Sequence, residues 1–200
     1  VLTWAIINRE TEIGMTGHYI DEGVDTGDII LQRTFPIHWE DTLSDVMNGV
    51  ATEFPDLVSD TVQLINNGQV QRQPQVDLVG TYFARREDGD EWIDWSDSSL
   101  NLYNKIRAIS HPGPGARTLQ GMQVVIVQKA FFDPDWPIYR GIPGQVVGRR
   151  PNAGVIVKTG DSTLLIQKVQ TTNGEIQTAN WRIGTRLGIN LFALGYAFIS

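Results

Sequence analysis

The stretch GMTGHYIDEGVDTGDIILQRTFPI, residues 14–37, decides how the first part of this 200-residue chain folds. It places an acidic loop between two runs with strand character, residues 14–20 and 28–37. About seven residues separate these runs, which favours an antiparallel hairpin over a crossover connection. An ordinary turn needs one glycine and one Asp or Asn, yet this loop carries four carboxylates. They belong to Asp21, Glu22, Asp25 and Asp28.

The hydrophobic spacing on both sides of this hairpin predicts helices. Residues 2–8 have the character of the end of a short apolar helix. Residues 40–68 repeat apolar side chains at helical spacing, and Asp41 or Thr42 is the expected N-cap. Pro55 lies inside this pattern. Because an interior proline costs a helix roughly 3 kcal/mol, we expect a kink or a break there.

The second part of the chain has a different character. Residues 69–80 lose all periodicity and form the expected linker. A short helix is predicted from about residue 98 to residue 109, with Ser96 or Asp97 as its cap and with its inner stripe on Leu100, Tyr103 and Ile106. Short β-patterned runs with glycine-rich turns follow and predict a small barrel; they are residues 122–132, 144–150, 154–160, 162–170 and 174–178.

Composition sets wide limits on function. Hydrophobic residues make up 41% and charged residues 20% of the chain, as in ordinary globular proteins. There are no cysteines, which excludes disulfides and thiolate chemistry. No run approaches eighteen apolar residues, so we expect no membrane association and a cytoplasmic location. The net charge of −7 is divided into −10 over residues 1–80 and +3 over residues 81–200, which suggests two units with different surfaces.

The acidic loop permits three interpretations. A calcium-binding loop needs acids at alternating positions and a closing glutamate, and the spacing here fails, so we expect no metal. A solvated turn accounts well for Asp21 and Glu22, because Asp and Gly form turns. The functional interpretation rests on Asp25, which lies between Gly23 and Gly27. A carboxylate in such a position can point into a cleft while bare backbone approaches a flat ligand.

The residues around this loop resemble a known family. LTWAIINRETEIGMTGHYIDEGVDTGDIILQRTFPI, residues 2–37, is similar to the second half of the catalytic domain of 10-formyltetrahydrofolate-dependent formyltransferases. IDWSDSSLNLYNKIRAISHPGPGA (residues 93–116), GIPGQVV (141–147) and LLIQKVQ (164–170) resemble the smaller C-terminal domain found in part of that family. The resemblance implies an α/β fold. The C-terminal portion of a Rossmann-like domain would span residues 1–78, a small mainly-β, OB-like barrel domain 79–190, and a tail 191–200.

The resemblance also implies a site. The family uses an Asn, a His and an Asp, and the Asp corresponds to Asp25. The Asn and the His would precede Val1, so we expect a fragment that is inactive alone. The family's folate pocket maps onto Asp21, Glu22, Gly23, Val24 and Asp25, with 10-formyltetrahydrofolate as co-substrate. An amine attacking the formyl carbon generates an oxyanion, which fixed donors stabilise. A carboxylate beside a histidine favours the imidazolium that can act as such a donor.

Several acceptors and partners stay open within this family. His18–Tyr19 resembles the amino-sugar branch, and no basic channel for RNA phosphates is evident, so we favour the primary amine of a nucleotide-linked amino sugar. The alternative is formylation of initiator methionyl-tRNA. The second alternative is a non-catalytic truncated relative that acts as a binding module.

Overall fold

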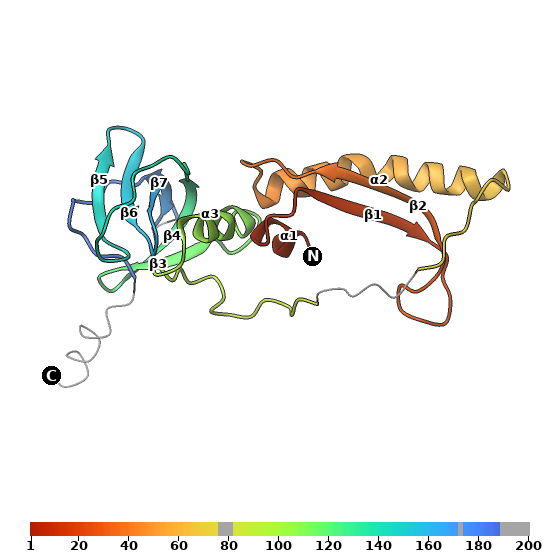
Figure 1. Ribbon diagram of the computed structural model, residues 1–200, viewed down its shortest axis with the longest axis horizontal. Helices are drawn as coiled ribbons and strands as arrows, with labels where there is room; N and C mark the ends of the chain where they lie inside the picture. The colour runs from red at the N-terminus through yellow and green to blue at the C-terminus, as the bar shows by residue number, and fades with distance from the viewer. Residues whose placement is uncertain (76–81, 172–173, 189–200) are drawn as a thin grey trace. The chain divides into compact units, whose positions relative to one another are not determined.

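The structure, a computed structural model, describes residues 1–75, 82–171 and 174–188 (Figure 1). The chain divides into two units, Val1–Arg85 and Arg86–Ser200, and each is described by itself below. The expected domain boundary between residues 78 and 79 and the expected tail 191–200 lie outside the described residues.

Unit 1 consists of an antiparallel hairpin and a long helix that packs against it (Figure 1). Its elements are α1 (Leu2–Ile7), β1 (Glu12–His18), β2 (Ile29–Pro36) and α2 (Leu43–Asn66). The hairpin register pairs Glu12 with Pro36 and His18 with Ile29, and it shifts between Gly17 and His18. The predicted helices and the predicted hairpin are therefore confirmed, with element ends that differ by a few residues.

Helix α2 starts at a reciprocal cap and continues through its proline. The Thr42 hydroxyl accepts from the backbone N–H of Asp45, and the Asp45 carboxylate accepts from that of Thr42 at 2.9 Å. The helix is continuous from Leu43 to Asn66 although it contains Pro55, so a break at the proline is wrong. Packing along the hairpin offsets the missing hydrogen bond, because the buried face of α2 includes Leu57, which is 2% exposed.

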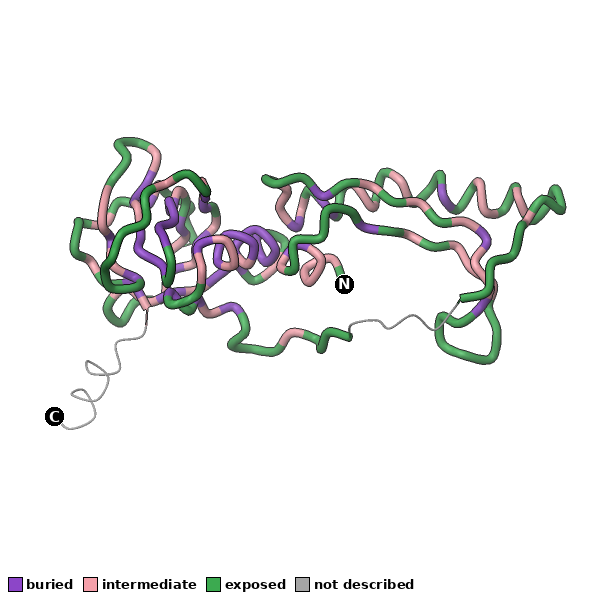
Figure 2. The backbone as a smooth tube through the Cα atoms, in the orientation of Figure 1, coloured by how far each residue is buried: buried purple, intermediate pink, exposed green. Residues whose placement is uncertain are grey.

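Helix α2 also carries apolar side chains that face solvent. They are between 42% and 53% exposed and recur at intervals of three, four or seven residues along the helix, at Met47, Phe54, Val58, Val62 and Ile65. Figure 2 shows how α2 alternates between buried, intermediate and exposed positions.

Unit 2 combines one helix with an antiparallel sheet (Figure 1). Its elements are α3 (Ser99–Ala108), β3 (Ala116–Gln120), β4 (Gln123–Phe131), β5 (Val146–Arg150), β6 (Gly154–Lys158), β7 (Thr163–Gln170) and β8 (Ile176–Thr178). The strand order is β3-β4-β7-β6-β5, and β8 pairs with β7. Five of these strands were predicted. The prediction missed β3, because ARTLQ has no clear apolar alternation and becomes a strand by pairing with β4.

The sheet of unit 2 is not a closed barrel within the part of the chain that the structure describes. Strand pairing runs from β3 to β5 and does not return to β3. The segment 184–188 joins these two edges by isolated hydrogen bonds: Gly188 N–H donates to the Leu119 carbonyl at 2.9 Å, and Leu187 N–H donates to the Gly144 carbonyl at 2.8 Å. The expected mainly-β unit is confirmed, and the closed OB-like barrel is not.

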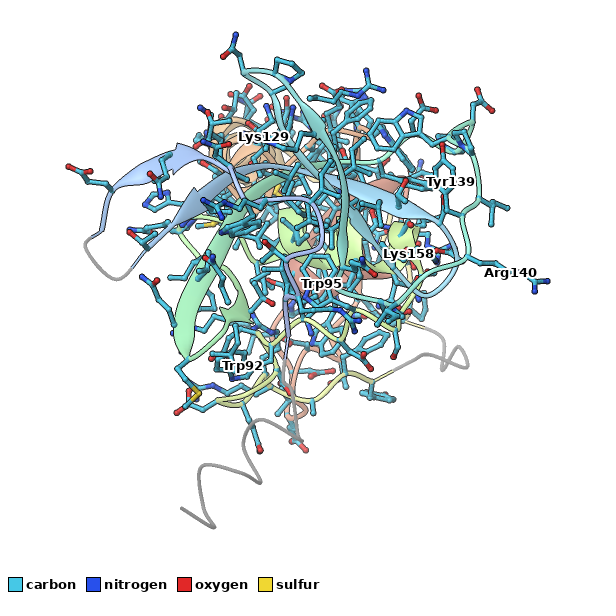
Figure 3. All side chains as sticks on the ribbon, turned by 90° about the vertical axis from the view of Figure 1, so that its left-hand side faces the viewer. Trp92, Trp95, Lys129, Tyr139, Arg140 and Lys158 are labelled. Carbon is cyan, nitrogen blue, oxygen red and sulfur yellow. The ribbon has the colours of Figure 1, made fainter. Side chains whose placement is uncertain are left out.

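Helix α3 and Trp95 belong to the core of unit 2. The N-cap is Ser98, one residue after Asp97 and two after Ser96, the two predicted caps, and its hydroxyl accepts from Asn101 N–H at 3.2 Å. Trp95 is 4% exposed and donates to the Thr118 hydroxyl at 2.9 Å. Figure 3 shows Trp95 among the inner side chains, whereas Arg140 projects outward. The inner stripe of α3 is formed by Leu102, Tyr103 and Ile106, while Leu100 is only half-buried.

The first turn of α3 is held by Asp161, in the turn between β6 and β7. One carboxylate oxygen, Oδ1, accepts from Ser99 N–H at 2.8 Å, from Ser162 N–H at 2.6 Å and from the Thr159 hydroxyl at 3.1 Å. Burial alone raises the pKa of Asp161, but the hydrogen bonds from Ser99, Ser162 and Thr159 outweigh it and hold the pKa below its usual value. A carboxylate distant in sequence thus caps the helix.

Candidate active-site loop

The loop between β1 and β2 is closed at its neck. Tyr19 N–H donates to the Asp28 carbonyl at 2.9 Å, across the base of the loop. Gly27 is buried directly against this contact. A β-carbon at Gly27 would lie 1.8 Å from the Tyr19 carbonyl oxygen, so no other residue fits there without opening the neck. Both strands therefore enter the loop at fixed positions.

Asp21 organises the loop from within. Its Oδ1 accepts from the Thr26 hydroxyl at 2.6 Å and from Gly23 N–H at 3.0 Å, the pattern of an Asx turn. The Thr26 hydrogen bond, followed by that from Gly23, lowers the pKa of Asp21. Asp21 is fully exposed to solvent yet carries out a structural task, as the turn interpretation of this residue predicts.

Asp25 is presented to solvent in an uncommon backbone conformation. Its φ is 56°, in the left-handed region that Asp tolerates better than most residues. Its side chain is 86% exposed, and Oδ1 lies 3.6 Å from His18 Nε2. His18 Nδ1 is 2.8 Å from the Tyr19 carbonyl, which can only accept, so Nδ1 carries the proton and Nε2 faces Asp25. The two side chains form an ion pair whenever the ring is protonated.

The other residues expected to bind folate lie at the exposed tip of the same loop. Glu22, Gly23 and Val24 are exposed, and Val24 is 89% exposed (Figure 2). The structure therefore brings all five predicted residues together on one short surface loop. Among the described residues, no group of His, Cys, Asp or Glu has the arrangement of a metal site. No helix in the described ranges is both long enough and apolar enough to cross a bilayer.

One contact to the loop was not predicted. The side-chain amide of Gln75 donates to the carbonyl of Asp25 at 2.9 Å and to that of Gly27 at 2.8 Å. The sequence assigned residues 69–80 to a linker, because Gln and Pro in an aperiodic stretch predict no tertiary contact. In the sequence these carbonyls lie some fifty residues before Gln75. No local signal could have revealed the contact.

Family models match both units of the chain. The family model described as "Formyl transferase" matches residues 1–62, and the model described as "Formyl transferase, C-terminal domain" matches residues 86–184. The chain belongs to the formyltransferase family. The Asp25 loop lies inside the first match, and the helix and sheet of unit 2 lie inside the second.

Two similar curated proteins carry the same name. The methionyl-tRNA formyltransferase of Synechococcus sp. (strain JA-3-3Ab) is 36% identical over 182 residues, which cover 89% of this chain and 56% of that protein. The enzyme of the same name from Synechocystis sp. (strain ATCC 27184 / PCC 6803 / Kazusa) is 32% identical, over 84% of this chain and 56% of the relative. The chain thus spans little more than half the length of these curated relatives.

Solved structures extend the comparison to folate-bound proteins. WlaRD, a sugar 3N-formyltransferase crystallised with dTDP and 5-N-formyl-THF, matches with a TM-score of 0.59 and 25% identity, over 86% of this chain and 60% of that one. HypX from Aquifex aeolicus, in complex with tetrahydrofolic acid, matches with a TM-score of 0.64 and 24% identity, over 89% of this chain and 31% of that one. The likeness to HypX concerns the fold alone.

Proposed function

We propose that the protein containing this chain transfers a formyl group from 10-formyltetrahydrofolate to a primary amine, with Asp25 as its catalytic carboxylate. The observation that carries this proposal is the presentation of Asp25. It is exposed, in a left-handed conformation, on a loop closed at its neck and hydrogen-bonded from within. Backbone strain of this kind is typical of functional loops.

The chemistry requires a charge partner for a histidine. The amine nitrogen attacks the formyl carbon, and the carbonyl oxygen of the formyl group becomes an oxyanion. When the intermediate collapses, the bond between the carbon and N10 of the folate breaks, and the proton lost by the amine is passed to N10. An imidazolium can stabilise the oxyanion and move this proton. In the proposed mechanism Asp25 holds that imidazolium, which we expect to belong to a histidine outside this chain.

We propose that the folate donor binds beside Asp21, Glu22, Gly23, Val24 and Asp25. Two observations support this assignment: the bound 5-N-formyl-THF of the similar sugar formyltransferase and the exposed apolar surface of Ile20 and Val24 at the loop. Titration of the chain with 5-formyltetrahydrofolate, followed by NMR of the loop amides, tests the site. We expect shifts confined to the loop, and an unperturbed loop at saturating folate would contradict it.

Methionyl-tRNA is the acceptor best supported by the relatives. Two similar curated relatives carry that name at 36% and 32% identity, compared with 25% for the sugar formyltransferase. A nucleotide-linked amino sugar, favoured from the sequence, is the second candidate because of that sugar formyltransferase. The two acceptors are distinguished by measuring formylation of charged initiator tRNA and of dTDP- or UDP-amino sugars in parallel.

The catalytic role of Asp25 is tested by removing its charge. Turnover is measured for the chain alone and for the chain mixed with a second polypeptide. That polypeptide is the part of the Synechococcus methionyl-tRNA formyltransferase that lies outside the matched region. Asp25→Asn keeps a residue that tolerates the left-handed region, so we expect normal folding and a loss of turnover of about 100-fold or more. Asp28→Asn is the matched control, with the same charge change on the same loop and little expected effect. Near-normal turnover of Asp25→Asn refutes the role. Folate binding without turnover in the complemented wild type favours the binding-module alternative.

A further inference from the structure

The segment after α2 runs along the active-site loop and does not leave unit 1 directly. Ile29 N–H donates to the Gln73 carbonyl at 2.8 Å, and Gln73 N–H donates back at 3.1 Å, so this segment pairs with the start of β2. The Arg72 guanidinium lies 4.2 Å from the centroid of the Tyr19 ring at the neck of the loop. We call residues 72–75 the strap. Figure 1 shows the chain descending from α2 to the loop at this place.

Gln75 makes the contact by which the strap holds the backbone of Asp25. A single amide nitrogen donates to the carbonyls of Asp25 and Gly27, which flank Thr26 on both sides. Each proton of the amide therefore fixes the orientation of one peptide group. Asp21 holds the same turn from within the loop, because its carboxylate accepts from the Thr26 hydroxyl and from Gly23 N–H.

The Asp25 carboxylate depends on these backbone contacts for its direction. At 86% exposure it has few neighbours that could restrain it, and its interaction with His18 spans 3.6 Å. A non-glycine residue in the left-handed region is strained and needs surrounding structure to hold it there. The two Gln75 hydrogen bonds act on the carbonyl of this residue and on that of its near neighbour.

We propose that Gln75 is a positioning residue for the formyltransferase reaction: by donating to Asp25 O and Gly27 O, it fixes the backbone that aims the catalytic carboxylate. This inference rests on the proposed function of Asp25. A displacement of about 1 Å in a reacting group can cost two orders of magnitude in rate, so a side chain that never touches substrate can control turnover. The strap thereby becomes part of the active site.

A series of substitutions separates hydrogen-bond donation from space filling. Gln75→Met has a similar length and no donor, whereas Gln75→Lys restores donors to the same carbonyls. If Gln75 acts by donating hydrogen bonds, Gln75→Lys should retain a more rigid loop and a higher turnover than Gln75→Met. If Gln75 acts only by filling space, Gln75→Met should retain more of both. Gln71→Met, on an exposed side chain just before the strap, is the matched control.

The first measurement needs no enzymatic activity. Backbone ¹⁵N relaxation of residues 24–27 is recorded for the wild-type chain and the variants. We expect order parameters near 0.85 in the wild type, below about 0.6 in Gln75→Met, and near the wild-type value in Gln75→Lys and Gln71→Met. A loop in Gln75→Met that is as rigid as in the wild type overturns the proposal.

The second measurement is turnover in the complemented assay described for Asp25. We expect Gln75→Met to lower kcat by roughly 10-fold to 100-fold while KM for the folate donor changes by less than about 3-fold, with recovery in Gln75→Lys. An unchanged kcat in Gln75→Met overturns the positioning role. If the wild type is inactive while Gln75→Met loosens the loop, the proposed function fails and the structural role of Gln75 stands.

Discussion

Replacing Asp161 with alanine removes the carboxylate that, beside the Ser98 N-cap, holds the first residue of α3 in unit 2. Oδ1 of Asp161 accepts three hydrogen bonds, two from backbone N–H groups and one from the Thr159 hydroxyl. One of these donors belongs to Ser99, the first residue of α3, which is completely buried. Without the carboxylate, this N–H loses its acceptor inside the protein.

The expected loss follows from these contacts. An N-cap is worth about 0.5–2 kcal/mol, and a buried donor left without a partner costs about 1–3 kcal/mol. Since Asp161 itself is exposed, solvent screening reduces its electrostatic share, and we expect about 2 kcal/mol in total. For a domain of this size that corresponds to a decrease of roughly 8 °C in the Tm of unit 2.

Thermal unfolding of unit 2 is followed by the NMR signals of its buried methyl groups, such as those of Val157 and Leu164. Asp133→Ala is the control, because that carboxylate accepts from Asp135 N–H at 2.9 Å within an exposed local turn. We expect this control to unfold within about 2 °C of the wild type, since substitutions at such surface sites seldom exceed 0.5 kcal/mol. A Tm of Asp161→Ala within that same range would refute the capping role.

The stabilisation by Asp161 also has a definite pH dependence. Its folded-state pKa is lower than the ordinary value of 3.8 that we take for the unfolded chain. The contribution is therefore complete above that unfolded value and is lost as the pH falls through the folded pKa. The stability difference between the wild type and Asp161→Ala should be constant from pH 7 to about pH 5 and shrink below about pH 4. A difference that grows on acidification contradicts this assignment.

Two further substitutions test unit 1. Gly27→Ala forces a β-carbon against the Tyr19 carbonyl. We therefore expect the stability of unit 1 to fall by roughly 1–3 kcal/mol and the amide of Tyr19 to exchange faster. Unchanged exchange at Tyr19 would show that the neck is not closed there. Thr42→Ala removes the capping box of α2 and should lower the stability of unit 1 by about 1 kcal/mol in chemical denaturation, whereas a loss below 0.3 kcal/mol would show that Asp45 caps the helix alone.

Local sequence patterns determined most of the secondary structure. The apolar spacing of residues 40–68 predicted α2, and the two runs around the acidic loop predicted the hairpin, because each pattern reports one buried face. The errors lie where packing outweighs a local preference. Helix α2 continues through Pro55 because its buried face is held along the hairpin, and β3 is a strand because β4 supplies its partner.

For the candidate site, the sequence by itself was enough to single out Asp25 and its loop, because that loop is one contiguous segment with a recognisable motif. The conformation of the loop was decided by tertiary structure. Gln75 contacts it from the strap, His18 faces Asp25, and the buried position of Gly27 is defined by Tyr19. The hydrogen bond between Gln75 and Asp25 joins residues fifty positions apart. It forms because the segment after α2 packs back against the loop, and no local sequence pattern predicts that packing. For this protein, the sequence singled out the candidate carboxylate Asp25, and only the fold revealed the contacts that hold its loop.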